Sequence, residues 1–109
     1  MERRKFKRYV FTFEVLCKNI FRLFWIKQIY AVDVSRGGMK IYAKRNFRKG
    51  TILKLKVLNP FIKKPIRAKA QVVWSSRKDP DKDIWAMGLN FIDIKQTESN
   101  KLLYGVDIL

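Results

Sequence analysis

The chain has 109 residues, enough for one domain with one modest hydrophobic core. Its 25 lysine and arginine residues outnumber nine acidic ones, a formal net charge of +16, but 48% of it is hydrophobic, which excludes a disordered polybasic tail. It has no histidine and one cysteine, Cys17, which excludes the usual metal clusters, an intramolecular disulfide and a histidine-based catalytic centre. We therefore expect no enzyme, metal or cofactor, but a domain that binds an anion in a reducing compartment.

Most of the chain reads as short β-strands separated by turns. Four stretches alternate apolar and polar residues, which is typical of strands with one buried face. Their apolar residues are Phe11, Phe13 and Val15; Leu53, Leu55 and Val57; Ala68, Ala70, Val72 and Trp74; and Trp85, Met87, Leu89 and Phe91. Residues 29–34 and 39–42 are two further strand candidates, and turn-forming residues separate the strands. The pattern predicts an all-β fold, an antiparallel barrel or sandwich; a closed barrel would leave no exposed strand edge.

The C-terminal part predicts one short α-helix that packs over the strands. Thr97 can cap this helix, with Glu98 in its positive first turn. Leu102 and Leu103 supply an apolar contact, and Gly105 supplies a stop. The other apolar residues are expected to fill the core: Cys17, Gly88, Phe91 and the three tryptophans at 25, 74 and 85 are read as packing residues.

No segment predicts a membrane span or a signal peptide. The most apolar stretch, 20–26, has seven residues and includes Arg22, whereas a span needs roughly 20 apolar residues. The basic start of the chain is not followed by an uninterrupted apolar segment. We therefore expect a cytoplasmic protein, although the net charge leaves attraction to an anionic membrane surface open.

The positive charge is unevenly distributed along the sequence. Residues 34–78 contain fourteen basic residues and no acidic one. Many of them, such as Lys54, Lys56, Arg67 and Lys69, alternate with apolar strand residues. Such a run forms either an ordinary solvated face or a surface that attracts a polyanion, and the sequence leaves both readings open.

Two short motifs are better arranged for ligand binding than the general charge. Residues 4–8 form an RxxxR pattern just before the first strand, and residues 33–38 form a DxSxxG pattern between the second and third strands. The strand 88–93, Gly-Leu-Asn-Phe-Ile-Asp, follows downstream. Together these features resemble the PilZ domain family, the bacterial receptors for the second messenger cyclic di-GMP (c-di-GMP). The resemblance implies a six-stranded antiparallel β-barrel with a short C-terminal helix, built here from an arm, 1–9, and a single domain, 10–109.

The resemblance also implies roles for the motif residues. Arg4 and Arg8 would contact phosphate or guanine through their planar guanidinium forks, or stack on the purine. Asp33 would accept hydrogen bonds from the N–H groups of guanine, and the Ser35 hydroxyl would contact the same base or a phosphate. Gly38 would allow a close backbone approach or a positive φ. Asp and Ser also cap turns commonly, and a basic N-terminus frays commonly, so purely structural readings stay open.

Three neighbours of the motif residues are weaker candidates for ligand contact. Arg3 directly precedes the RxxxR pattern, and Arg36, inside the second motif, is a candidate phosphate contact. Gly37 can form the turn as well as Gly38 can, although it is not the motif position. In a mechanism of this kind the arm is mobile without ligand and orders over c-di-GMP. The changed surface would then act on a protein partner in trans.

Two other functions use the same features. A basic β-barrel that binds nucleic acid would share the charge and the aromatic residues. A PilZ-like domain that docks a protein without binding nucleotide would share the fold. The presence of both motifs favours the c-di-GMP receptor, and the long basic run leaves room for a further anionic partner such as nucleic acid or a membrane.

Overall fold

A computed structural model describes residues 13–102; residues 1–12 and 103–109 are not described. The described chain forms six strands and one helix: β1 (Phe13–Asn19), β2 (Ile26–Val34), β3 (Gly38–Ala43), β4 (Ile52–Leu58), β5 (Ile66–Asp79), β6 (Ile84–Asp93) and α1 (Gln96–Leu102). The predicted all-β fold with a short helix near the C-terminus is confirmed. Phe11, Leu103 and Gly105, which the sequence places in the first strand and around the helix end, lie outside the described residues.

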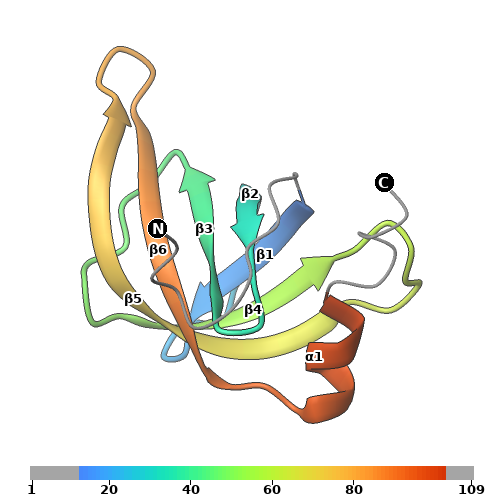
Figure 1. Ribbon diagram of the computed structural model, residues 1–109. Helices are drawn as coiled ribbons and strands as arrows, with labels where there is room; N and C mark the ends of the chain where they lie inside the picture. The colour runs from blue at the N-terminus through green and yellow to red at the C-terminus, as the bar shows by residue number, and fades with distance from the viewer. Residues whose placement is uncertain (1–12, 103–109) are drawn as a thin grey trace, which may run out of the picture.

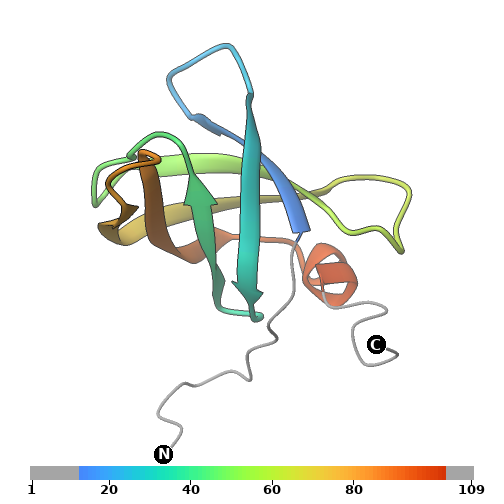
Figure 2. The same cartoon turned by 90° about the horizontal axis from the view of Figure 1, so that it is seen from above.

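The six strands close into an antiparallel barrel in the order β1-β2-β3-β6-β5-β4 (Figure 1). The closing pair joins β1 to β4 and runs from Glu14 opposite Leu58 to Asn19 opposite Leu53. The barrel therefore has a continuous hydrogen-bonded wall, as expected for short half-buried strands whose edge N–H and C=O groups need hydrogen-bond partners. The β1–β2 loop and the β2–β3 turn lie at opposite ends of β2 (Figure 2).

The core fills the interior of the barrel with alternating side chains from every strand. Three residues of β1 and three of β4 are fully buried: Phe13, Val15 and Cys17, and Leu53, Leu55 and Val57. The predicted packing role of Cys17 is confirmed. Burial raises the pKa of its thiol to about 12, and the nearby Arg45 opposes this shift.

The short helix lies across one end of the barrel and contacts β5 (Figure 1). Its Leu102 is completely buried and belongs to the hydrophobic core. The buried Asn59 side chain donates from Nδ2 to the carbonyl oxygens of Lys101 and Leu102, at 3.1 and 3.4 Å. The helix begins one residue before Thr97, so the expected capping role of Thr97 is wrong: Ser99 N–H donates to the Lys95 carbonyl, which closes the first turn.

The strands β5 and β6 form a long hairpin that extends beyond the rest of the barrel (Figure 1). Their pairing shifts register at three places, one of them between Val72 and Trp74. A bulge of this kind reverses the face on which the following residues lie. Consequently Trp74 is 40% exposed on the outer surface, and the expectation that it lies in the core is wrong.

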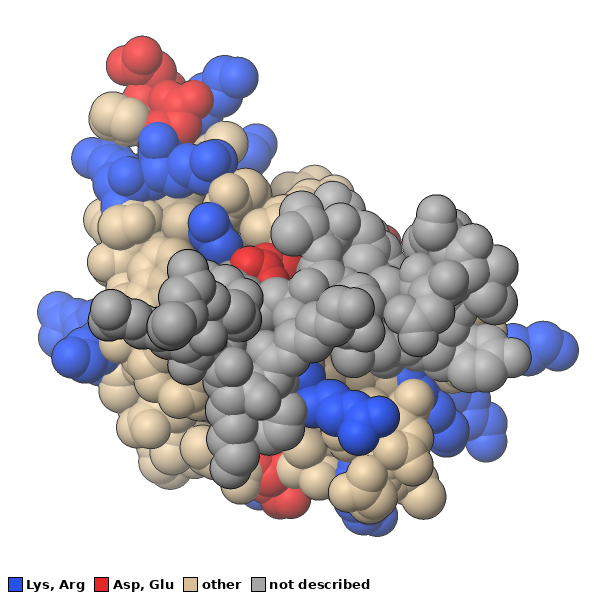
Figure 3. Space-filling view, in the orientation of Figure 1, with Lys and Arg blue, Asp and Glu red and all other residues tan. Residues whose placement is uncertain are grey.

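Basic side chains are spread widely over the surface, whereas acidic ones are confined to a few places. On the face shown in Figure 3, an acidic group marks the end of the β5–β6 hairpin, and blue side chains lie around the periphery. Arg77 and Asp83 form a 2.8 Å ion pair within this hairpin, and the hydrogen bond from Arg77 holds the pKa of Asp83 below its usual value. Among residues 13–102, no helix is long and apolar enough to cross a membrane.

Candidate functional site

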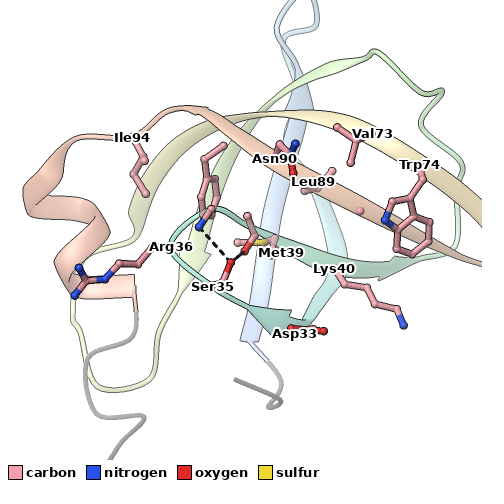
Figure 4. Close-up of a pocket in the computed structure, with 14 residues that line it drawn as sticks. Asp33, Ser35, Arg36, Met39, Lys40, Val73, Trp74, Leu89, Asn90 and Ile94 are labelled. Atoms are coloured by element: carbon pink, nitrogen blue, oxygen red, sulfur yellow. Dashed lines mark hydrogen bonds between the residues drawn. The ribbon is translucent and has the colours of Figure 1, made fainter. Parts of the chain in front are cut away.

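An open hollow of about 760 Å³ lies on the outer surface of the barrel beside the β2–β3 turn (Figure 4). Four strands contribute one transverse row to it, because Asp33 is paired with Lys40, Lys40 with Gly88, and Gly88 with Trp74. Every residue of the second motif, 33–38, lines the hollow except Val34, which is buried in the core. The lining residues are Asp33, Ser35, Arg36, Gly37, Gly38, Met39, Lys40, Val73, Trp74, Gly88, Leu89, Asn90, Phe91 and Ile94.

The β2–β3 turn is held in a defined shape by Ser35. Its backbone N–H donates to the Gly38 carbonyl at 2.9 Å, and its hydroxyl accepts from the Gly37 N–H at 3.2 Å. The hydroxyl also lies 3.4 Å from the Gly38 carbonyl, to which it donates. Phe91 N–H then donates to the Gly37 carbonyl at 2.9 Å, which attaches the turn to β6. The turn-capping reading of Ser35 is therefore correct, and one acceptor position of the hydroxyl remains for a further donor.

Gly38 is required by close packing between two strands. A Cβ at this position would lie 1.9 Å from the Leu89 carbonyl oxygen and 3.2 Å from the Asn90 Cα. Gly50 is the glycine with a positive φ among the described residues, so the alternative of a left-handed conformation at Gly38 is wrong. The absence of a side chain lets β3 and β6 approach each other at the floor of the hollow.

One wall of the hollow is the indole of Trp74. A Cβ at Gly88 would lie 2.0 Å from the Trp74 Nε1 atom, so the ring lies directly over this glycine. The prediction that Gly88 serves barrel packing is correct in this sense: it makes room for an aromatic ring from the neighbouring strand. The ring nevertheless keeps part of its surface in solvent. It therefore offers an apolar face near Lys40, across the hollow from Ser35 and Arg36 of the β2–β3 turn (Figure 4).

Both signs of charge occur in the hollow. The carboxylate of Asp33 comes from β2, and the ammonium of Lys40 comes from the paired position of β3. Lys40 Nζ also lies 5.5 Å from the ring centroid of Tyr42, and Lys78 Nζ lies 4.6 Å from it. The hydrogen bond with Lys78, followed by the charges of both lysines, lowers the pKa of Tyr42. The hollow thus has an acceptor for polar donors and a positive edge for an anion.

The structure brings together only some of the expected site residues. Asp33, Ser35, Gly37 and Gly38 all line the hollow, and exposed Arg36 lines it too, although its side chain extends away from Trp74 (Figure 4). The expected contacts Arg3, Arg4 and Arg8 lie outside the described residues.

Three of the lining residues that were not predicted as site residues can contribute polar or aromatic contacts: Lys40, Asn90 and Trp74. Lys40 lies outside the motifs, and Asn90 lies in the strand 88–93, which supports the family resemblance but gave this residue no role; the strand register places both beside the second motif. Trp74 was assigned to the core because its strand alternates regularly up to the bulge. Within the part of the chain that the structure describes, no three metal-ligating side chains come together.

Several solved structures share this fold. An inhibitor of motility from Bacillus subtilis, MotI/DgrA, has a TM-score of 0.76 at 21% identity, over 94% of this chain and 49% of that one. The PilZ domain of Escherichia coli YcgR with c-di-GMP has a TM-score of 0.71 at 14% identity, over 93% and 86%. YcgR in complex with c-di-GMP gives 0.70 at 14% identity, over 98% and 46%. The chain thus spans about half the length of two of these proteins.

Sequence comparison gives the family directly. No curated protein has a significant match to this sequence. The PilZ domain, by contrast, matches residues 2–106, which include both motifs, all six strands and the helix. The resemblance inferred from the two motifs is confirmed: the chain belongs to the PilZ domain family.

Proposed function

We propose that this domain is a receptor for c-di-GMP and that the ligand occupies the hollow beside the β2–β3 turn. The observation that carries the proposal is the convergence of Asp33, Ser35 and Gly38 on one hollow whose opposite wall is Trp74. Its volume of about 760 Å³ lies within the range usual for small-ligand sites, roughly 300–1,000 Å³. The same fold is found with c-di-GMP in YcgR, which supports this choice of ligand.

The chemistry of the hollow suits a guanine nucleotide. An ionised Asp33 accepts hydrogen bonds, as the N1–H and N2–H₂ donors of guanine require. The Ser35 hydroxyl keeps an acceptor position, and the exposed face of Trp74 offers a surface on which a purine stacks. Lys40 supplies a positive charge for a phosphate, and Arg36 supplies a second one at the edge.

The arm completes this proposed site. We place Arg4 and Arg8 over the ligand, with Arg3 as an additional contact, because guanidinium groups bind both phosphate and the guanine edge in two parallel hydrogen bonds. The arm, 1–9, would order when the ligand binds and would change the surface offered to a protein partner in trans. In this proposal the domain acts as a cytoplasmic adaptor and performs no catalysis.

Calorimetric titration with c-di-GMP at about 0.15 M salt tests the proposal. We expect saturable binding of c-di-GMP but not of GTP or a short single-stranded DNA, with the stoichiometry read from the same experiment. Loss of one bidentate arginine contact costs about 1–3 kcal/mol, so Arg4→Ala or Arg8→Ala is expected to weaken binding about 5- to 150-fold. Arg48→Ala, an exposed arginine outside the hollow, is the matched control and leaves the affinity unchanged.

Two outcomes would contradict this proposal in different ways. Binding of DNA without binding of c-di-GMP would replace the receptor with a nucleic-acid-binding barrel. No binding of any of the three ligands would leave a PilZ domain that docks a protein without nucleotide. If the wild-type protein binds c-di-GMP and Arg4→Ala and Arg8→Ala bind it with the same affinity, only the role of the arm is refuted.

A further inference from the structure

The β1–β2 loop is the most apolar exposed part of the described surface. Three of its side chains are almost fully solvent-exposed: Phe21 at 87%, Leu23 at 84% and Phe24 at 82%. Single exposed apolar residues are common on protein surfaces, but three within four consecutive positions form a cluster that needs a reason. The loop protrudes at the end of the barrel opposite the β2–β3 turn (Figure 2).

The base of this loop has a fixed conformation. Asn19 closes it, since its carbonyl oxygen accepts from the Arg22 N–H at 2.9 Å and its side-chain Oδ1 accepts from the Phe21 N–H at 3.0 Å. Ile20 N–H donates to the Ile52 carbonyl of β4 at 3.3 Å. The exposed side chains are therefore presented on a turn that is joined to the barrel wall.

The loop continues into a strongly basic surface on the outside of β1, β4 and β5. Cross-strand pairing aligns Lys18 with Lys54 and Lys54 with Lys69, and in the next row it aligns Lys56 with Arg67. Like charges placed directly opposite each other destabilise a sheet. Three such pairs on one face therefore reduce stability, and an anion would relieve the repulsion that remains although Lys69 is also paired with Asp93 of β6.

Trp25 connects the apolar loop to this basic surface. Lys56 Nζ lies 4.3 Å from the centroid of its ring, and Lys18 Nζ lies 5.4 Å from it. Together they line a second hollow of about 450 Å³ on the basic surface. Six basic residues line this hollow against two acids, Asp93 and Glu98, and Glu98 is already paired with Lys101 at 3.7 Å.

We propose that the β1–β2 loop and this basic surface bind an anionic lipid bilayer. An apolar tip flanked by lysine and arginine provides the two signals that peripheral binding requires: insertion of side chains at the headgroup level and attraction to anionic lipid. Residues 15–32 contain no acid, and Arg22 and Lys27 add positive charge beside the tip. Nucleic acid explains this surface less well, because Leu23 offers no ring for stacking and the apolar side chains project from a convex loop.

The apolar tip of the proposed membrane surface lies away from the c-di-GMP site, whereas the second hollow meets the first one at Ile94, which lines both. The tip and the β2–β3 turn lie at opposite ends of β2, whose nine residues span roughly 25 Å at the usual rise of a strand. A molecule on a membrane through its β1–β2 loop would therefore keep the hollow at the β2–β3 turn open to solvent.

Co-sedimentation with vesicles at about 0.15 M salt tests this inference. We expect the protein to bind phosphatidylcholine vesicles that contain about one-third phosphatidylglycerol at least tenfold more tightly than pure phosphatidylcholine vesicles. Phe24→Ser is expected to weaken this binding at least about fivefold. The matched control Phe61→Ser, an exposed phenylalanine of the β4–β5 loop, is expected to leave it unchanged. Phe21→Ser repeats the test at a second position of the tip.

A second pair of variants separates the basic surface from net charge. Lys54→Gln with Lys69→Gln removes two charges from the basic surface, and Lys63→Gln with Lys64→Gln removes two exposed charges from the β4–β5 loop. At about fivefold for each charge near the bilayer, the first pair is expected to weaken binding about 25-fold and the second pair much less.

Three results would overturn the inference. Equal binding to both kinds of vesicle would remove the role of the charge. Equal effects of Phe24→Ser and Phe61→Ser would remove the role of the loop. Tighter binding of a short DNA duplex than of anionic vesicles, weakened by the same variants, would assign the surface to nucleic acid.

Discussion

Gly38→Ala separates the structural role of this glycine from its place in a ligand-binding motif. The added Cβ would lie 1.9 Å from the Leu89 carbonyl oxygen, which must move by about 1.5 Å to reach the ordinary contact distance of 3.4 Å. The obstacle is backbone, so β3 and β6 have to separate at this point. The hydrogen bond from Phe91 N–H to the Gly37 carbonyl lies directly beside the clash.

The expected loss of stability follows from these two contributions. Overpacking costs about 1–3 kcal/mol, and weakening one backbone hydrogen bond costs about 1 kcal/mol. Gly38→Ala is therefore expected to lower the free energy of unfolding by about 2–4 kcal/mol. For a domain of this size, that corresponds to a fall in Tm of at least about 8 °C.

Urea and thermal unfolding without ligand measure this effect. Arg36→Ala, an exposed position of the same turn, is the control for a substitution that leaves the contact between the strands in place. A Gly38→Ala protein that unfolds at the wild-type urea concentration but has lost c-di-GMP binding would refute the argument, because the glycine would then serve the ligand and not the contact between strands.

Three further results are expected from the described contacts. Gly88→Ala displaces the Trp74 indole from its place over the glycine, so the tryptophan fluorescence changes and c-di-GMP binding weakens about tenfold through loss of one stacking contact; unchanged affinity would exclude this ring from the site. The Cys17 thiol, buried and with a pKa near 12, reacts far more slowly with a thiol reagent in the native protein than in urea up to about pH 9; similar rates would contradict its burial. Asn59→Ala lowers the free energy of unfolding by about 1–3 kcal/mol, because two carbonyl oxygens at the end of α1 lose their donor; exposed Asn100→Ala is the control, and equal stabilities would show that the helix is held by Leu102 alone.

The sequence predicts the barrel well because each strand has one buried face. Alternation at Phe13, Val15 and Cys17 and at Leu53, Leu55 and Val57 carries over directly to the buried residues of β1 and β4. The second motif is equally predictable, since its turn-forming residues lie between two strands. The start of the helix at Gln96 is harder to predict, because several neighbouring polar residues are equally suitable as its N-terminal cap.

Alternation fails where a bulge interrupts it, and this failure hid part of the site. Up to Val72 the apolar residues of β5 point inward, and the register shift before Trp74 moves that side chain to the outside. No feature of the sequence around Trp74 itself indicates this register shift. The signal that was available is Gly88, whose missing side chain is needed because a ring from the next strand covers it.

The fourteen basic residues of 34–78 also become easier to explain once the strands are placed. Only Arg36 and Lys40 reach the hollow at the β2–β3 turn, which two phosphates of one ligand could occupy. Lys54, Lys56, Arg67 and Lys69 lie instead on the outside of β4 and β5, aligned in facing pairs beside the apolar β1–β2 loop. Facing like charges lower the stability of a sheet, so a receptor for a dinucleotide alone would gain nothing from them. Their alignment beside three exposed apolar side chains is what binding to the proposed anionic lipid bilayer requires.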